Sequence, residues 1–559
     1  MRCAYEVWLR HFSHLCGLMG RIVLLMVFGC LGFSLLPAKD ADNESPVVEL
    51  KLSDYLQEVL QHNESIQAQM FEAEANRRKA RGEYGIFEPD FKTSLLRESN
   101  QRTNNVQEQA AQSGQSSFSE RNTIYDGGVE SLFPTGGKIR LGATQSDLVN
   151  NVNPNPLAFL GGAPLTNFTQ QYQTFVGATV TQPLLKNAGF TPTLAAIRLA
   201  ALDSEIAFQQ YRRQLMATIY QSEGAYWNLY YAQEQVRFFD DSVAVAQNVL
   251  DDSREKLSAG QGAELDVMEA QSALALRNTK RNDAMQNYYD AVGHLQTLTG
   301  SAPMPYQIGS GGSAIRVVDE PGETNVPLSY ADSFYQAFEL NPDYLIQQEK
   351  MNQENVRLGF ARNQLLPELN FKAGYGYNGL GVTPGESWNV AVSQNFPSWS
   401  LGLELTVPLG GNIKGRNAYS AARLNLQQAY LNLRGAQTEI GNALNVSIQK
   451  AQAWQQSIQS YKTVVHYNEE LLKTEFERLK AGTVEARKVL EVEADLLDSR
   501  QELASALTRH RRALLEVELN SGTILKQRGL DITREELKRQ TAKLLEQYDG
   551  SSVRSALPH

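Results

Sequence analysis

The chain has 559 residues, of which 20% are charged and 42% are hydrophobic, and its formal net charge is −10. A protein that binds nucleic acid needs a basic surface, so this charge balance argues against nucleic acid as a partner. The composition is also too polar for a bundle of membrane-spanning helices.

The N-terminus is predicted to be a cleavable secretory signal over residues 1–38. Arginines precede an apolar stretch at Ile22–Leu36, which is short for a spanning helix, and a polar, acidic segment follows. The alternatives are a membrane anchor and, because of Cys30, a lipoprotein. All three cysteines lie in this segment: Cys3, Cys16 and Cys30. We therefore expect a mature chain without disulfides or cysteine-ligated metal, in the periplasm or outer membrane of a Gram-negative cell.

One sequence pattern occurs twice. Asn63 and Pro89 in the first half recur at one common spacing as Asn341 and Pro367 in the second half. Such self-similarity indicates two copies of one supersecondary unit, and so one body made of two halves. The predicted divisions are a first repeat at residues 46–300, a linker at 301–325, a second repeat at 326–525 and a C-terminal extension at 526–559.

The first repeat predicts a helix, a strand region and two more helices. Residues 52–84 are rich in Ala, Glu, Gln, Arg and Lys and predict a helix, and between 91 and 181 strand signals alternate with loops rich in Gly and Asn. Helices are expected at 192–257 and 263–298, with a break at Gly260. Pro192 suits the first turn of the longer helix.

The second repeat predicts the same order. The expected elements are a helix at 328–365, strands at 371–377 and 401–407, a helix at 414–480, a break at Gly482 and a helix at 484–520. The extension adds a polar helix at 528–548.

The long helices carry apolar residues at a strict spacing of seven, which indicates a coiled-coil seam. The row in the first repeat is Leu229, Val236, Val243, Leu250 and Leu257, and its counterpart in the second is Ile458, Val465, Leu472 and Leu479. A helix over residues 192–257 would be roughly 100 Å long. We therefore expect a long helical wall in which two shorter helices, placed end to end, flank each long one.

The strand region suggests part of a membrane β-barrel, because it alternates, is bracketed by prolines and lies in an exported chain. Closed barrels are one of two structures that satisfy backbone polar groups in lipid. One chain has too few strands, since about eight is the usual minimum. Several chains must then share one barrel.

Several motifs, in duplicate and in order, resemble the TolC-type outer-membrane efflux proteins over residues 50–525. They are Phe87-Glu-Pro-Asp-Phe91, Leu366-Pro-Glu-Leu369, Gln182-Pro-Leu-Leu-Lys-Asn-Ala-Gly189, Ala225-Tyr-Trp-Asn-Leu229 and two helix-end turns ending in Ala-Gly. The resemblance implies a homotrimer with a coiled-coil α-barrel across the periplasm and a β-barrel in outer-membrane lipid. It implies a passive channel for efflux or type I secretion, without a cofactor, that works with a periplasmic adaptor and an inner-membrane transporter.

The number of strands per chain stays open at this point. The first repeat has extra residues and a candidate hairpin around Phe133–Gly137, between possible strands at 123–131 and 138–144. The resemblance implies four strands per chain and twelve in a trimer, whereas a hairpin within the wall would give six and eighteen. We favour four.

The resemblance also points to residues at the helix ends. A gate lined by acidic residues would lie just after the two turns, and the candidates are Asp266, Glu269, Lys488 and Glu491. Lys488 stands where relatives usually carry Asp, so the acidic ring is weakened or replaced by a Lys/Glu pair. The alternative is that these are solvated charges in the first turn of a helix. The adaptor-docking candidates are Leu257, Ala259, Gly260, Leu479, Ala481 and Gly482, and the alternative is that these residues form structural turns without a partner.

The sequence supports no catalytic function. The histidines are scattered without metal-ligand spacing, and there is no nucleophile–base grouping. The aromatic group Tyr226, Trp227, Tyr230 and Tyr231 favours helix packing over a ligand site. The alternative to a channel is a soluble periplasmic coiled-coil scaffold, in which the Gly- and Thr-rich segments are ordinary loops.

Overall fold

The computed structural model describes residues 48–111, 116–151, 170–300, 315–322 and 329–551. The predicted signal and most of the predicted linker lie outside the described residues. The chain divides into two units, of which Met1–Val48 with Pro305–Ala314 lies almost wholly outside those residues. The other unit, Glu49–Met304 with Ile315–His559, is called the body below.

The body is mainly helical, and its helices repeat in order. The first repeat contains α2 (Leu52–His62), α3 (Glu64–Gly82), the 3-10 turn η1 (Glu83–Phe87), α5 (Phe190–Thr193), α6 (Ala195–Ser258) and α7 (Glu264–Thr299). The second contains α8 (Tyr330–Leu340), α9 (Pro342–Asn363), α11 (Ile413–Lys480) and α12 (Ala486–Ser521). None of the helices in the described ranges is both long and apolar enough to cross a membrane.

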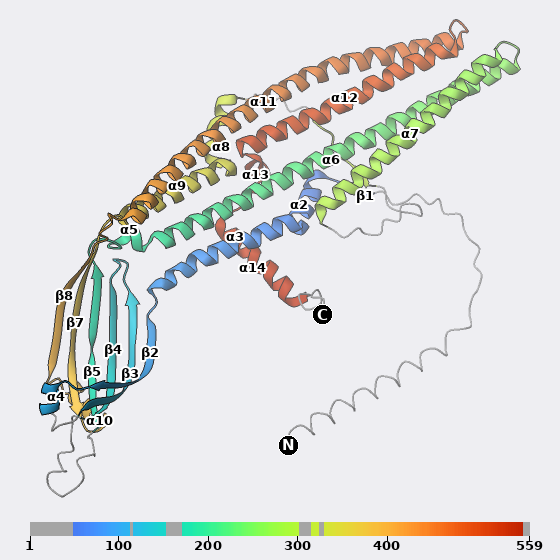
Figure 1. Ribbon diagram of the computed structural model, residues 1–559. Helices are drawn as coiled ribbons and strands as arrows, with labels where there is room; N and C mark the ends of the chain where they lie inside the picture. The colour runs from blue at the N-terminus through green and yellow to red at the C-terminus, as the bar shows by residue number, and fades with distance from the viewer. Residues whose placement is uncertain (1–47, 112–115, 152–169, 301–314, 323–328, 552–559) are drawn as a thin grey trace, which may run out of the picture. The chain divides into compact units, whose positions relative to one another are not determined.

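Each long helix is flanked by two shorter ones. α6 packs against α7 over one part of its length and against α3 over another, and α11 packs in the same way against α12 and α9 (Figure 1). α6 also packs against α9 and α12, which joins the two repeats. The predicted fold class, long antiparallel coiled-coil helices with a sheet, is confirmed.

The repeated asparagines explain why the predicted helices at 52–84 and 328–365 are each broken in two. Asn63 ends α2 and caps α3: its Oδ1 accepts from the backbone N–H of Ile66 at 3.1 Å, and its Nδ2 donates to the carbonyl of Leu298 at 2.9 Å. Asn341 caps α9 and donates to the carbonyl of Asn520 at 2.8 Å. Each asparagine therefore starts one short helix and satisfies a carbonyl at the end of another.

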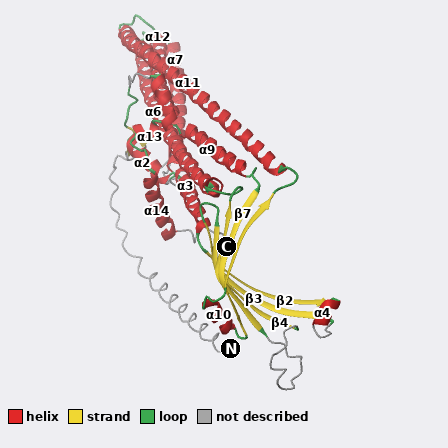
Figure 2. Cartoon of the chain, turned by 90° about the vertical axis from the view of Figure 1, so that its left-hand side faces the viewer, coloured by secondary structure: helices red, strands yellow, loops and turns green. Residues whose placement is uncertain are grey.

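Six strands form one antiparallel sheet. They are β2 (Asp90–Thr103), β3 (Ser117–Leu132), β4 (Lys138–Asn150), β5 (Gln171–Pro183), β7 (Glu368–Gly381) and β8 (Pro397–Thr406), paired in that order. Figure 2 shows them curving away from the helices. The expectation of four strands is therefore wrong for this chain, because β3 and β4 insert between β2 and β5 and pair with both.

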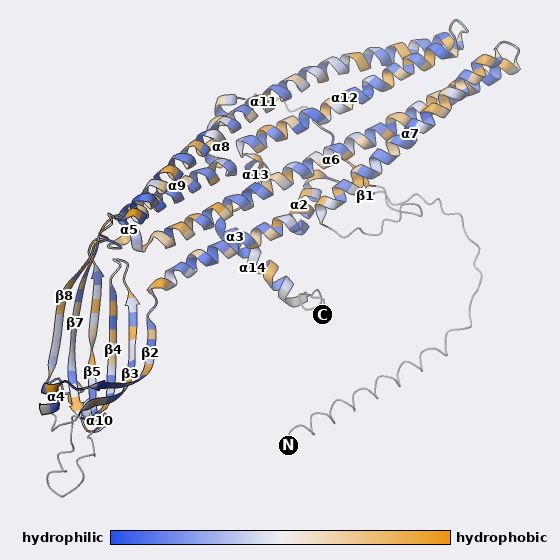
Figure 3. Cartoon of the chain, in the orientation of Figure 1, coloured by the Kyte–Doolittle hydropathy of each residue, from blue (hydrophilic) through white to orange (hydrophobic). Residues whose placement is uncertain are grey.

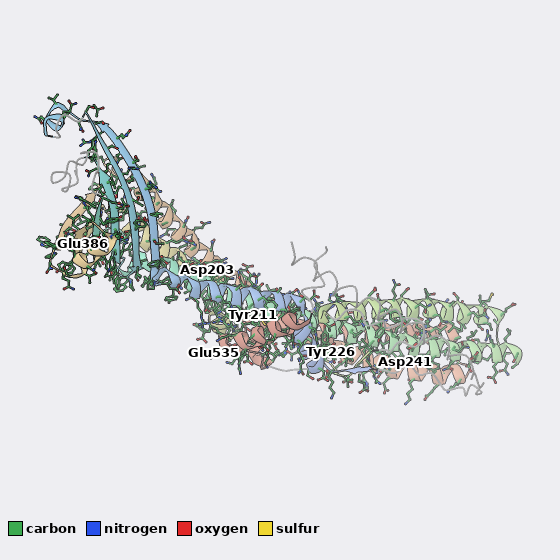
Figure 4. The ribbon with its side chains drawn as sticks, turned by 90° about the horizontal axis from the view of Figure 1, so that it is seen from below. Asp203, Tyr211, Tyr226, Asp241, Glu386 and Glu535 are labelled. Carbon is green, nitrogen blue, oxygen red and sulfur yellow. The ribbon has the colours of Figure 1, made fainter. Side chains whose placement is uncertain are left out.

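Short elements complete the fold. A two-stranded sheet joins β1 (Val48–Leu50) to β6 (Ile315–Val317). The helix α4 (Val106–Ala111) lies between β2 and β3 in the chain, and α10 (Pro384–Val392), which packs on β7 and β5, lies between β7 and β8. Figure 4 places Glu386 of α10 beside the sheet and Asp241 of α6 well along the helices.

The segment from residue 524 to residue 551, which contains the described part of the predicted extension, is a packed part of the body. It forms α13 (Ile524–Gln527) and α14 (Arg534–Ser551). Ile524, Leu525 and Leu537 are buried in the same apolar cluster as Tyr55 and Leu215. This cluster is the main core, at the level where the short helices of the first repeat meet.

Tyr226, Trp227 and Tyr230 of α6 belong to that core, whereas Tyr231 packs against a separate cluster that contains Phe238 and Phe239. Tyr226 and Trp227 are buried, and the Tyr226 hydroxyl donates to Asp319 Oδ2 at 2.6 Å and lies 3.0 Å from the carbonyl oxygen of Leu50. Burial raises the pKa of the Tyr226 phenol above its ordinary value. Tyr226 therefore fixes the end of β1 and the segment after β6 to α6, and the burial of Tyr226 and Trp227 agrees with the packing interpretation.

Candidate functional site

One face of the sheet is apolar from edge to edge. A single row of paired residues crosses all six strands, and it reads Phe91, Val129, Leu141, Ala178, Tyr375 and Trp399. On β8 the same face continues with Leu401, Leu403 and Leu405, and these side chains are 61–68% exposed. Hydrophobic and hydrophilic residues alternate along the strands in Figure 3. A large exposed apolar band of this kind needs a partner or lipid to cover it.

The opposite face is polar, and ion pairs connect its neighbouring strands. Lys92 Nζ lies 2.8 Å from Glu130 Oε2, and Lys372 Nζ lies 2.7 Å from Glu404 Oε2. Asp126 pairs with Arg140 and accepts from Thr144 Oγ1 at 2.7 Å. Apolar residues on one face and charged residues on the other are the pattern of a membrane barrel wall with a wet interior.

A row of glycines marks where the polar face is crowded. Gly128, Gly142, Gly177 and Gly376 pair in register across β3, β4, β5 and β7. A Cβ added at Gly142 would lie 2.7 Å from the carbonyl oxygen of Gly127, and one at Gly177 would lie 2.6 Å from that of Tyr375. Glycine is needed where backbones approach this closely, as at the inside of a sharply curved sheet.

At the other end of α6 and α11, the two helical hairpins turn with the same geometry. Gly260 has a φ of +70° and Gly482 a φ of +71°. The N–H groups of Gln261 and Thr483 donate to the carbonyls of Lys256 and Arg478 at 2.8 and 2.9 Å. Both are left-handed helix ends of the Schellman type, which glycine adopts without strain.

The docking candidates are exposed, with one exception. Leu257, Ala259, Gly260, Ala481 and Gly482 lie on the surface of the turns. Leu479 is buried in an apolar cluster with Leu250 and Val489, and its carbonyl accepts from Lys256 Nζ at 3.1 Å. The two hairpin ends of one chain therefore pack against each other, and the side chain of Leu479 is used inside that contact.

The gate candidates lie in the first two turns of α7 and α12. Asp266 Oδ2 accepts from the N–H of Ala263 at 3.2 Å and so caps α7. Lys488 Nζ lies 3.1 Å from Glu491 Oε2, and both side chains are exposed. The start of α12 therefore presents a cation paired with a carboxylate where α7 presents a carboxylate, and Glu269 lies partly buried one turn further on.

A buried ion pair that the sequence analysis did not identify ties three helices together near these turns. Arg277 of α7 pairs with Glu493 of α12, donating from Nε at 2.9 Å, and also donates from Nε to Ser242 Oγ of α6 at 3.1 Å. Its Nη2 donates to the carbonyl of Leu490 at 3.1 Å. Arg277 and Glu493 are 7% and 3% exposed, so solvent screens the pair little.

The sequence did contain a signal for this pair. Arg277 occupies a row of seven-residue spacing whose other members, Ala270, Ala284 and Ala291, are all buried. A charged residue in a seam row must find a partner inside the coiled coil.

The sequence profile of the family described as "Outer membrane efflux protein" matches residues 138–301 and 334–523, which is more than half of the chain. The chain belongs to the outer membrane efflux protein family. The matched ranges contain both hairpin turns and the strands β4, β5, β7 and β8, whereas β2 and β3 lie before the first of them.

Two curated relatives are similar over most of their length. The chain is 24% identical over 373 residues to "Proteases secretion protein PrtF" of Dickeya chrysanthemi, covering 65% of this chain and 76% of the relative. It is 22% identical over 338 residues to "Outer membrane protein TolC" of Vibrio cholerae, covering 58% and 72%.

Solved structures share the fold. The Campylobacter jejuni CmeC outer membrane channel is similar with a TM-score of 0.57 and 14% identity, over 92% of this chain and 94% of that one. The outer-membrane channel OprN gives a TM-score of 0.59 and 13% identity, over 89% and 98%.

This outer membrane efflux protein is therefore a transport channel and not an enzyme. The alternative of a soluble scaffold is not supported, because a soluble protein has no use for an apolar band that crosses a whole sheet.

Proposed function

We propose that three copies of this chain form a continuous duct that extends from the outer membrane into the periplasm. The observation that carries the proposal is the placement of a two-faced sheet and of two exposed hairpin turns at opposite ends of the same long helices. The sheet contacts outer-membrane lipid with its apolar face and lines the lumen with its polar face. Energy comes from an inner-membrane transporter, and the duct itself is passive.

A lysine on the apolar face of β8 tests the membrane wall. Leu401→Lys is expected to cost about 2–4 kcal/mol, because the charge would enter the middle of the hydrocarbon layer. Ser400→Lys is the matched control, since Ser400 is the neighbouring residue and faces the polar side. The measurement is the amount of folded protein in the outer-membrane fraction and its melting temperature in detergent. Equal behaviour of the two variants would contradict the assignment of the faces.

The exposed residues of the hairpin turns bind the periplasmic adaptor. Leu257, Ala259, Gly260, Ala481 and Gly482 offer a small, mostly apolar surface at the ends of the two hairpins. Its two halves have the same backbone geometry, so one kind of adaptor surface fits both turns.

A β-branched residue at the second turn tests adaptor docking. Gly482→Ile is expected to reduce export strongly while the trimer remains, because a left-handed backbone with a side chain costs about 1–2 kcal/mol and distorts the turn. A Cβ at Gly482 meets no atom within 4 Å, so the effect arises in the backbone and the outer surface. Gly435→Ile, at an open position within α11, is the control. Normal export by Gly482→Ile would remove the turn from the docking surface.

The first two turns of α7 and α12 form the periplasmic gate. In a trimer, Asp266 and Glu269 supply carboxylates from each copy, and the pair of Lys488 and Glu491 supplies little net charge. This arrangement supports a ring with weaker preference for cations than one that is acidic in both repeats.

A further inference from the structure

The hairpin of β3 and β4 is built as part of the membrane wall. β3 pairs with β2 from the pair of Thr103 and Ser117 to the pair of Asp90 and Glu130. β4 pairs with β5 from the pair of Leu148 and Gln171 to the pair of Lys138 and Thr181. Separating the hairpin from the wall would break the ladder hydrogen bonds along both of its sides. In lipid no water is present to bind the freed backbone groups, so such a separation would be strongly unfavourable.

The hairpin also has the two faces that the wall requires. Val129 and Leu141 continue the apolar row between Phe91 of β2 and Ala178 of β5. On the polar face, its residues Asp126, Arg140 and Thr144 form a hydrogen-bonded group. A flap outside the barrel would not need an apolar side that matches its neighbours row by row.

The two edge strands of the sheet are open and fit each other. β2 and β8 have one neighbour each, and every described residue of β8 except Ser398 is exposed. Six is an even number of antiparallel strands, so β2 and β8 run in opposite directions and can pair in the same manner as the strands within the sheet. An unpaired edge of 14 residues, such as β2, does not persist in lipid or water without a partner.

We propose that the outer-membrane barrel of this protein has eighteen strands, six from each of three copies, with β8 of one copy paired to β2 of the next. The inference rests on the proposed trimeric duct and extends it to the strand number and the subunit contact. The occupant of each open edge is a second copy of this chain, because its other edge has the complementary direction and the same alternation of faces.

An eighteen-stranded wall has a wide lumen. Barrel diameter grows about linearly with strand number, so this barrel would be about 1.5-fold wider than one of twelve strands. Barrels of about 16–18 strands leave an open aqueous channel.

Cysteine pairs in the assembled protein test whether the hairpin is in the wall. Strands are about 4.8 Å apart, so β2 and β5 would be about 14 Å apart across the hairpin, which is too far for a disulfide. Phe91→Cys with Val129→Cys and Leu141→Cys with Ala178→Cys are expected to cross-link within one copy in the outer membrane. Phe91→Cys with Ala178→Cys is expected to stay reduced, and its cross-linking would establish a four-stranded wall and overturn the proposal.

A second set of pairs tests the contact between copies. Leu401→Cys combined in turn with Phe91→Cys, Thr93→Cys and Leu95→Cys is expected to give disulfide-linked dimers and trimers for at least one combination. Leu401→Cys with Val129→Cys, which is not on an edge strand, is the control and is expected to give none. Trimers without any β8–β2 link would overturn the edge pairing alone. A protein that is monomeric in detergent would instead overturn the proposed duct.

Discussion

Replacing Arg277 with methionine is expected to lower the free energy of unfolding by about 3–5 kcal/mol, which is the usual cost of leaving one member of a buried ion pair alone. The arginine lies on α7 and donates to Ser242 of α6 and to Glu493 of α12, so it joins the three helices. Without it, the Glu493 carboxylate stays buried between two hairpins with no cation beside it. The measurement is thermal or chemical unfolding of the purified protein in detergent.

Two further variants show whether the loss comes from the buried charge. Arg281 lies one turn along α7 and pairs with Asp240, but both side chains are exposed. Arg281→Met is therefore expected to cost only about 0–1 kcal/mol. Replacing both Arg277 and Glu493 with apolar residues should recover most of the stability lost by Arg277→Met. A loss as large in the double variant would indicate a packing defect and contradict the electrostatic explanation.

The hairpin turns show what the sequence can predict. Gly260 and Gly482 were found from the pattern alone, and their backbones agree within one degree in φ. A left-handed helix end is a local structure, determined by a few neighbouring residues, so repeated sequence leads to repeated geometry. The breaks at Asn63 and Asn341 are local in the same sense, although the predicted helices passed over them.

Equivalent positions in the two repeats can still differ in their surroundings. Leu257 is 39% exposed and Leu479 is 4% exposed, although each ends the heptad row of its own repeat. The Leu479 side chain packs with Leu250 and Val489, and Lys256 Nζ of the first hairpin donates to the Leu479 carbonyl at 3.1 Å. This contact is between segments more than two hundred residues apart, and no local pattern contains it.

The prediction of four strands per chain was wrong for the same reason, because it depended on contacts between distant segments. The strands at 123–131 and 138–144 were visible in the sequence and lie within β3 and β4. Whether these strands join the sheet depends on their pairing with β2 and β5. The strand propensity of the residues does not decide it. The apolar row through Val129 and Leu141 was the available signal, because only a wall strand needs alternate residues that match its neighbours.

Replacing Arg528 with methionine is the second substitution expected to have a large effect, of about 3–5 kcal/mol. Arg528, at the end of α13, donates from Nε to Glu223 Oε1 at 2.6 Å and from Nη2 to Glu223 Oε2 at 3.0 Å. Its Nη2 also lies 3.0 Å from Glu518 Oε2. Glu223 is fully buried, so the substitution leaves two carboxylates facing each other without the cation between them.

The loss should also depend on pH, and its sign follows from Glu518. Burial raises the pKa of Glu518 above its ordinary value, whereas the charges of Arg528 and Arg511 lower it. Removing Arg528 raises this pKa further. A carboxyl group with a raised folded-state pKa stabilises the fold fully below its unfolded pKa of about 4.3, and this stabilisation is lost as the pH rises through the folded value. Arg528→Met should therefore lose more stability at about pH 8 than at about pH 5.

The control for this prediction removes the partner of Glu516, which lies on α12 as Glu518 does. Lys450 and Glu516 form an ion pair of 3.3 Å on the surface of α11 and α12. Lys450→Met is expected to cost about 0–1 kcal/mol, with little change between the two pH values. Melting temperatures measured at both pH values for the wild type and the two variants decide the matter. If Arg528→Met lost as much stability at the lower pH as at the higher one, the carboxylates would not be the cause, and the loss would arise from the packing of the C-terminal segment on the core.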